Sequence, residues 1–331
     1  MAPKKEKNKK YIPGKAKGLK IAISILAVLL VIGGVWAFFA YHDFSPVKAG
    51  HYDDTVVATL TYTDEGGREY TRQITYAEVR YYVKQLSLTP NQAIEAIQED
   101  WVPEVMAQMY GISLTAEDEA DKKNELLEYM GFCGEGNYEL VLAGQFMTEA
   151  LHDRFLYLKY LTARVHSNLC ENKESPLIAG ADREDIDAFL SNHFYAARHI
   201  YVPVGNNAQQ TIQQAYHKLV AGESFNTVLE EYNKDTAMTE EGILFVEDAM
   251  TEDYFAEVIN LQEGELSQVL ELESGFFIIE RLDPAELLAE NYDEAALSYA
   301  VDRYYHIYTD LQFDSVVTTE PVFHKIDSSI R

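Results

Sequence analysis

Two polar residues, Arg198 and His199, stand at the start of an apolar run that reads YAARHIYVPVG from Tyr195 to Gly205. The β-branched and aromatic residues of this run favour a strand. A histidine can be a hydrogen-bonded structural residue or a functional residue that exchanges protons near neutral pH. Residue type alone leaves both roles open for His199. The chain has no Cys-x-x-Cys, His-Glu-x-x-His or Gly-x-Ser-x-Gly pattern. We therefore expect no metal and no cofactor, and a hydrolase has little support.

The charge of the chain is divided between a basic head and an acidic body. The 331 residues carry a net charge of −27, but residues 1–20 alone carry +7, which leaves −34 on the rest. Such an acidic body repels phosphate backbones, so we expect no nucleic-acid partner. A hydrophobic content of 47 %, with 23 Tyr and 15 Phe, is enough for sizeable cores and argues against global disorder. The length favours two or three units.

Residues 21–41 contain no charged residue and follow the basic head directly. A helix needs about 20 apolar residues to span the hydrocarbon core of a bilayer. Lysines on the N-terminal side predict a single-pass anchor in the cell membrane with residues 1–20 in the cytoplasm and an extracytoplasmic body. The alternative is a cleaved signal peptide, but the run is longer than the usual apolar region of one and no clean cleavage site follows.

The two cysteines, Cys133 and Cys170, leave their redox state open. Outside the cytoplasm they could pair, and two free, partly buried thiols are equally plausible.

The first part of the body reads as a β-hairpin followed by helices. The hairpin covers 56–74, and Thr75 with Glu78 forms a capping box that begins the next helix. Apolar residues at three- and four-residue steps predict further helices at 91–100, 103–111, 115–131 and 138–169.

A second unit begins at Asp182, a helix cap, and is a compact α+β domain. We expect strands at 195–204, 266–272 and 276–282, and helices at 208–221, 224–232 and 253–261. A tail helix begins at about Tyr292, and a β-like run covers 315–319. A lone helix needs a partner for its apolar stripe, and the N-terminal helical unit is the obvious candidate.

Several blocks between residues 195 and 283 resemble parvulin-type peptidyl-prolyl isomerases. They are ARHIYV, AGESFNTVLEEYNKD, Met250 and Tyr254 in an M-x-x-x-Y pair, and LQEGELSQVLELESGFFII, in the family's order and spacing. With its anchor, hairpin, helices and C-terminal helix, the chain is similar to extracytoplasmic foldases of the PrsA/SurA type. In those proteins the N-terminal helices and the C-terminal segment pack together as a chaperone module.

The resemblance implies a site by position. His199, Asp235 and Ser274 take the catalytic polar positions. The substrate-binding positions fall on Leu244, Met250, Tyr254 and Phe277. Tyr254 replaces the usual Phe, and Phe277 stands where the family has its second histidine. The Gly-Gly-Asp-Leu-Gly segment is reduced to EGILF, residues 241–245.

Prolyl isomerisation breaks no covalent bond and needs no cofactor, since the enzyme has only to lower the barrier to rotation about a partial double bond. An apolar pocket and a polar network would suffice. Each residue also has a plainer reading: His199 as a satisfied structural histidine, and Met250 and Tyr254 as ordinary core. The loss of the second histidine leaves a weak or inactive parvulin-fold chaperone or peptide-binding scaffold as the alternative to an active isomerase.

The predicted fold class is α+β, with one N-terminal transmembrane helix. A mainly helical chaperone-like domain is completed by a C-terminal helix, and a parvulin-like domain with a small antiparallel sheet is inserted in it. The expected limits are a tail at 1–20, an anchor at 21–41, a linker at 42–55, the helical domain at 56–180, the parvulin-like domain at 181–285 and the C-terminal helix and strand at 286–331. The expected partners are unfolded or proline-containing secreted polypeptides and the membrane. A homodimer is left open.

Overall fold

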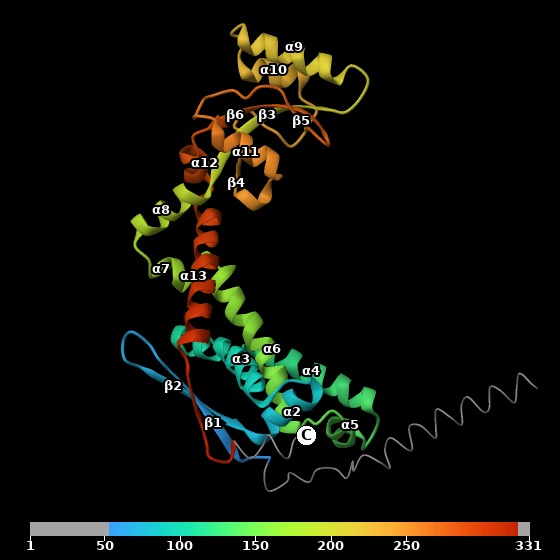
Figure 1. Ribbon diagram of the computed structural model, residues 1–331, viewed down its shortest axis with the longest axis vertical. Coiled ribbons are helices and arrows are strands. Elements are labelled where there is room, and N and C mark those ends of the chain that lie inside the picture. Colours follow the sequence, from blue (N-terminus) through green and yellow to red (C-terminus); the bar gives the residue numbers. More distant parts are fainter. Residues whose placement is uncertain (1–52, 324–331) are drawn as a thin grey trace, which may run out of the picture. The chain divides into compact units, whose positions relative to one another are not determined.

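The computed structural model describes residues 53–323 and divides them into two units (Figure 1). The first unit consists of residues up to Trp101, Thr115–Lys159 and the residues from Ser315 on, and the second of Val102–Leu114 and Tyr160–Asp314. The predicted anchor, residues 21–41, lies outside the described residues. Within 53–323, no helix combines the length and the apolarity that a membrane span requires.

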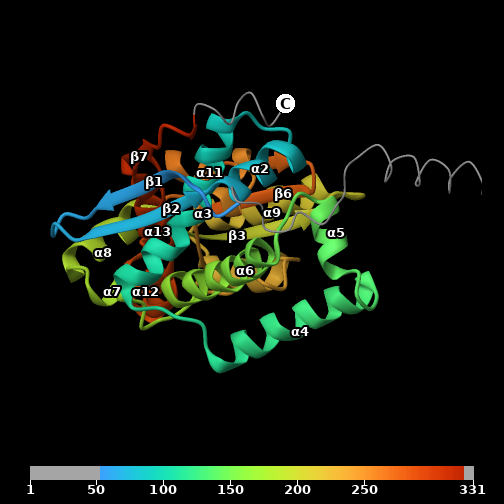
Figure 2. The same cartoon turned by 90° about the horizontal axis from the view of Figure 1, so that it is seen from below.

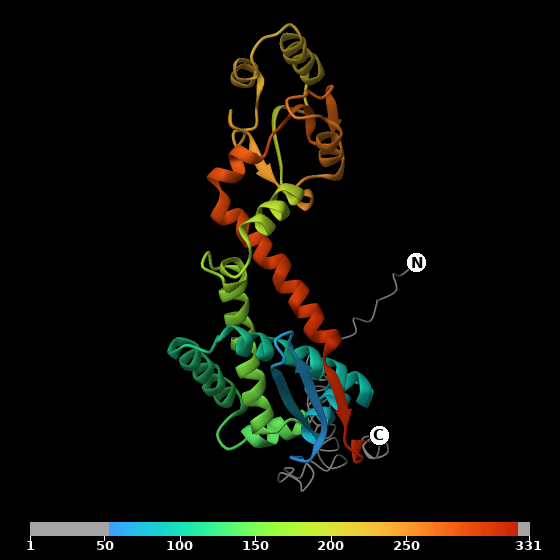
Figure 3. The ribbon, with the colours of Figure 1, turned by 90° about the vertical axis from the view of Figure 1, so that its left-hand side faces the viewer.

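A three-stranded antiparallel sheet opens the first unit. Strand β1 (Val56–Thr63) pairs with β2 (Glu69–Thr75) on one edge and with β7 (Val316–Thr319) on the other. Figures 2 and 3 show the red C-terminal strand beside the blue hairpin. The carboxylate of Asp64 closes the turn by accepting from the Arg68 amide at 2.8 Å. The predicted hairpin is confirmed, and the β-like run near the C-terminus is a strand of the same sheet.

Helix α2 (Tyr76–Gln85) begins at the predicted capping box, in which Thr75 and Glu78 each accept from the other's amide. Ile74 and Val79, on either side of this start, are both fully buried. The Glu78 carboxylate also accepts from Arg72 and lies 3.3 Å from Arg154 on a later helix. One side chain thus caps the helix and joins three segments of the unit.

The remaining helices of the chain's first half are α3 (Pro90–Tyr110), α4 (Ala116–Cys133), α5 (Tyr138–Gly144) and α6 (Glu149–Cys170). The prediction of two helices at 91–100 and 103–111 was wrong, because α3 continues through Pro103. An internal proline cannot donate to the carbonyl four residues back. The buried side chains of Trp101, Val102 and Val105 offset this loss.

The prediction of one helix at 138–169 was also wrong. Phe146 adopts a left-handed backbone with φ of 57°, which ends α5. The Thr148 hydroxyl then accepts from the Leu151 amide at 3.1 Å and begins α6. The apolar periodicity continues across this break, so the pattern alone does not reveal it.

The second unit contains α7 (Pro176–Ala179) and α8 (Arg183–His193), followed by a four-stranded antiparallel sheet with strand order β4-β3-β6-β5. Its elements are β3 (Tyr195–Pro203), α9 (Ala208–Val220), α10 (Phe225–Tyr232), β4 (Ile243–Phe245), the 3-10 turn η1 (Glu247–Ala249), α11 (Glu252–Asn260), β5 (Leu270–Leu272) and β6 (Gly275–Leu282). The predicted helices and strands of this domain are confirmed to within a few residues, except that β4 was expected as irregular loop and the strand at 266–272 is shortened to β5. Alpha-plus-beta architecture with small antiparallel sheets is therefore confirmed.

The sheet has two covered faces, with α9 and α10 on one side and α11 on the other (Figure 1). Alternation along β3 sends Ile200 and Val202 toward α9 and α10, whereas Ala197 belongs to the cluster formed with α11. His199, two residues after Ala197, shares the α11 face. This alternation decides which side chains can meet the histidine.

The chain leaves the domain through α12 (Ala285–Glu290) and α13 (Tyr292–Asp314), and α13 contacts α7 and α8. A small core joins Ile186 of α8, Leu288 of α12 and Ala296 of α13. The C-terminal segment thus contributes α13 to the second unit and β7 to the first. The predicted domain limits, and the packing of the C-terminal helix on the N-terminal domain, stay predictions.

Gly242, just before β4, gives a test of this fold. Its φ is +86°, and a Cβ there would lie 2.8 Å from the Ala197 carbonyl oxygen. Gly242→Ala combines backbone strain with a clash against main chain, so we expect a loss of about 3 kcal/mol in the free energy of unfolding of this domain. Calorimetry of the full chain would measure the loss.

Gly222→Ala is the matched control for Gly242→Ala. Gly222 has a similar φ of +94°, but nothing lies within 4 Å of an added Cβ. We expect strain alone, about 1 kcal/mol. Equal losses in the two variants would contradict the close approach of β4 to β3.

Candidate active site

His199 lies in the middle of β3, opposite Ile279 of β6, and only 7 % of the residue is exposed. Burial of an imidazole on a strand face is costly unless both ring nitrogens find partners. Nε2 lies 3.2 Å from Oδ2 of Asp235, and Nδ1 lies 3.0 Å from the hydroxyl of Tyr254. The structure therefore brings together His199 and Asp235, as expected, and adds Tyr254 as a polar partner.

Asp235 is held in place by the loop that follows α10. The Asn233 side chain accepts from the main-chain amides of Tyr201 and Asp235, at 2.9 and 3.2 Å, which fastens the loop to β3. The other carboxylate oxygen of Asp235, Oδ1, accepts from the Ala237 amide at 2.9 Å. Asn233 was not predicted as a site residue, although an Asn side chain that accepts from the main-chain amide two residues on is a common turn arrangement.

Aromatic rings enclose the histidine on its other sides. The ring of Phe277, on β6, lies 5.2 Å from His199 and 5.9 Å from Tyr254, both nearly perpendicular. Met250 and Phe277 are half-buried and pack against the cluster that contains Tyr254. Three of the four residues predicted to bind substrate, Met250, Tyr254 and Phe277, thus gather on the His199 face.

Leu244 and Ser274 are not brought to this cluster. Leu244 lies on the opposite side of β4 and packs against the core shared by α8, α12 and α13, while its neighbour Phe245 is buried in the cluster on the α11 face. A strand of alternating faces cannot present both residues to His199. Ser274 is exposed in the turn before β6, where its main-chain oxygen accepts from the Tyr201 hydroxyl at 2.8 Å.

Arg198, the polar neighbour of His199, faces away from the site and organises its edge. Its guanidinium donates to Glu280 on β6 and Asn226 on α10, both at 2.6 Å, and to the Glu240 carbonyl at 2.8 Å. It also stacks over the Phe225 ring at 4.4 Å. Arg198 thus ties two strands, a helix and the loop that leads from Asp235 to β4, which gives it a scaffolding role.

The electrostatics of the site keep the histidine neutral. Burial lowers the pKa of His199 from its ordinary value of 6.5, and the opposing effect of the Asp235 carboxylate is smaller. Burial, with a contribution from Asp235, raises the pKa of Tyr254. Near neutral pH the site therefore holds an uncharged imidazole and an intact phenol beside the carboxyl side chain of Asp235.

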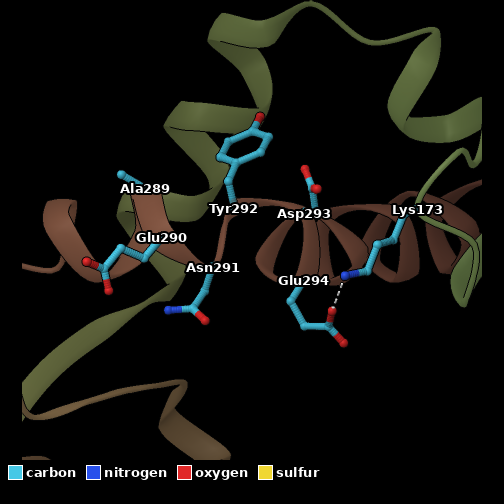
Figure 4. A pocket seen from close by; sticks show the side chains of 7 residues that line it. All are labelled: Lys173, Ala289, Glu290, Asn291, Tyr292, Asp293 and Glu294. Carbon is cyan, nitrogen blue, oxygen red and sulfur yellow. Dashed lines mark ion pairs between the residues drawn. The ribbon is translucent and has the colours of Figure 1, made fainter.

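A concave region of this unit lies where α12 meets α13 (Figure 4). It is lined by Lys173 and residues 289–294, and Lys173 donates to Glu294 at 2.7 Å. Both partners are exposed, so the pair contributes little. No side chain that was predicted for the site lines this region, and we assign it no chemistry.

One family model matches the segment of the chain that contains the His199 cluster. Residues 199–283 match the family model described as Rotamase, the PPIC-type PPIase domain. Among curated proteins, none matches the sequence of the chain.

Three solved structures illustrate the structural likeness. The peptidylprolyl isomerase PrsA from Bacillus cereus is 18 % identical over 84 % of this chain and 99 % of its own, with a TM-score of 0.32. The foldase protein PrsA from Streptococcus pneumoniae is 17 % identical over 82 % of this chain and 98 % of its own, with a TM-score of 0.33. NmPin, the parvulin of Nitrosopumilus maritimus, is 24 % identical over 28 % of this chain and 97 % of its own, with a TM-score of 0.24.

The lowered pKa of His199 predicts acid sensitivity. As pH falls below 6.5, the unfolded chain takes up a proton on this residue before the folded one does, so folding stability is lost until the lower folded pKa is passed. His199→Gln removes this proton uptake. We expect urea unfolding at about pH 7.5 and about pH 5 to show a smaller acid-induced loss in the variant than in the native chain.

His217→Gln is the matched control for this experiment, because His217 is exposed on α9. It should leave the acid-induced loss as in the native chain. An equal pH response of His199→Gln and the native chain would contradict the burial argument.

Proposed function

We propose that this chain, whose residues 199–283 form a parvulin-type peptidyl-prolyl cis-trans isomerase domain, is a membrane-anchored foldase that assists the folding of secreted polypeptides. The observation that carries the proposal is the hydrogen-bonded series of Tyr254, His199 and Asp235 beside the apolar side chains of Met250 and Phe277. In this proposal a proline ring packs against the apolar side chains, and the preceding amide then lies near the polar series.

Rotation about the prolyl bond requires loss of amide resonance, with a barrier of about 18–20 kcal/mol. An environment that is poor in water favours the twisted amide, because the planar form owes its stability to charge separation. Phe277 and Met250 supply that environment, and Asp235, whose side chain is 34 % exposed, is the polar group of the network most open to a bound peptide. No bond is made or broken, so neither a nucleophile nor a metal enters the mechanism.

The alternative function is a chaperone or peptide-binding scaffold that keeps the fold without substantial catalysis. Two observations favour it. Phe277 stands where the family pattern has a second histidine, and the first unit exposes large apolar side chains on α4 and α5. Among them are Leu127, Phe132 and Leu140, exposed by 54, 89 and 40 %. Such side chains are suited to hold unfolded segments without sequence preference.

The charge of the body bears on the choice of clients. The segment from Asp235 to Asp253 carries seven carboxylates and no Lys or Arg, and it borders the His199 cluster. We infer that basic or neutral polypeptides are favoured over acidic ones. Association of two copies of the chain stays a prediction.

A prolyl isomerisation assay tests the main proposal. The full chain in detergent should exchange the cis and trans forms of a proline-containing peptide faster than the spontaneous tens to hundreds of seconds. Asp235→Asn should lower the catalysed rate about ten-fold or more, because it removes a charged hydrogen-bonding group. Asp248→Asn, the same change at an exposed residue of η1, should not.

A catalysed rate no higher than the spontaneous one would overturn the isomerase proposal. If the same preparation still suppressed aggregation of an unfolded client, the scaffold alternative would stand in its place.

The proposed location rests on the uncharged run of residues 21–41 and the lysines before it. In cells, the full chain should remain in the membrane fraction after alkaline washing, and deletion of residues 21–41 should release it. Protease added outside intact cells should digest the body but spare an epitope tag at residue 1. Loss of that tag from the mature protein would instead indicate a cleaved signal peptide.

A further inference from the structure

The hydroxyl of Tyr254 and the ring of His199 form a buried polar pair. The two residues are 4 and 7 % exposed, and their hydrogen bond, at 3.0 Å, joins α11 to β3. Polar groups buried to this extent are costly unless they are satisfied. Tyr254 was predicted only as an apolar side chain of the substrate-binding site. The role of its hydroxyl was therefore not predicted from the sequence.

The partners of the ring decide which of its nitrogens carries the proton. An ionised carboxylate can only accept, and Asp235 Oδ1 already accepts from the Ala237 amide. Oδ2 therefore favours a proton on Nε2 of His199, since a bare Nε2 would set two lone pairs against each other at 3.2 Å. In a neutral ring Nδ1 is then unprotonated and must accept, and the Tyr254 hydroxyl is the donor that faces it.

We propose that Tyr254 is a positioning residue of the isomerase site: its hydroxyl fixes His199 in the Nε2–H tautomer and so directs a hydrogen bond at Asp235. The inference rests on the proposed function for its catalytic consequence, but its structural content stands on the geometry alone. Tyr254 and His199 act through Asp235, because their side chains are buried while that of Asp235 is 34 % exposed.

The residue types at positions 277 and 254 fit this assignment. Phe277 brings a ring to within 5.2 Å of His199 but has no group that can form a hydrogen bond with Nδ1. Tyr254 differs from phenylalanine by one hydroxyl, and that hydroxyl lies at Nδ1. Residue 277 on β6 thus offers His199 no hydrogen-bond partner, and the partner comes from α11 instead.

The test is the protonation of the His199 ring in the full chain. Labelling with ¹⁵N-histidine and solid-state NMR of lipid-reconstituted protein distinguish Nδ1–H from Nε2–H, and His199→Gln identifies the signal among the nine histidines. We expect a proton on Nε2 in the native chain. In Tyr254→Phe, which removes only the hydroxyl, a fraction of the rings should carry it on Nδ1.

Tyr195→Phe is the matched control for Tyr254→Phe. Tyr195 packs against the same apolar cluster, with its ring edge-on to that of Phe255 at 4.9 Å, so the change removes a hydroxyl beside the same core. It should leave the His199 signal as in the native chain. A proton on Nδ1 in the native chain, or an unchanged tautomer in Tyr254→Phe, would overturn the proposal.

The catalytic consequence is read separately. Tyr254→Phe should lower kcat about five-fold with little change in KM, the loss of one hydrogen bond that acts on the network and not on substrate binding. An unchanged kcat with a raised KM would make Tyr254 a wall of the pocket. If the native chain has no isomerase activity, the proposed function fails, while the NMR result still decides whether Tyr254 sets the tautomer.

Discussion

Burial of one imidazole is the constraint on which the site depends. His199 occupies an inner strand of its sheet, where a polar ring is tolerated only if both nitrogens are satisfied. One partner comes from a loop and the other from a helix, so both must be held at fixed positions relative to β3. Asn233 fixes the loop by bonding to the main chain of Tyr201, and the apolar packing of α11 fixes the helix. The surrounding elements therefore hold both partners within hydrogen-bond distance of the His199 ring.

Arg198, on the other face of β3, also holds elements around the site in place. Its guanidinium reaches β6, α10 and the Glu240 carbonyl, near one end of the loop between Asn233 and Gly242, and the Asn233 side chain fastens the other end to β3. The left-handed backbone of Gly242 lets that loop turn into β4 against the Ala197 carbonyl. Arg198 and His199 are thus adjacent on one strand but have different roles. Arg198 holds the loop, and His199 forms a hydrogen bond with a carboxylate on that loop.

Local signals predicted most of the elements. The Thr75–Glu78 box and the apolar strand at His199 are confirmed because short-range hydrogen bonds and alternation decide them. The errors occur where longer-range packing prevails: buried neighbours carry α3 through Pro103, and a left-handed Phe146 separates α5 from α6. The site divides in the same way. The family resemblance placed both His199 and Asp235 in the site, but the facing of Leu244 and the hydroxyl of Tyr254 depend on how β4 and α11 pack on the sheet.

Phe277, at the position where the family resemblance predicts a second histidine, places an apolar ring beside His199. Rotation about a prolyl bond is favoured by water exclusion as well as by polar contacts, because the twisted amide loses the charge separation of the planar one. A phenylalanine ring beside His199 increases exclusion and has no hydrogen-bonding group to satisfy. With both nitrogens of His199 engaged by Tyr254 and Asp235, polar stabilisation converges on one half-exposed carboxylate in an otherwise aromatic setting. The proposed site therefore depends on the position of the Asp235 carboxylate. Tyr254 contributes to that position through its hydrogen bond to His199.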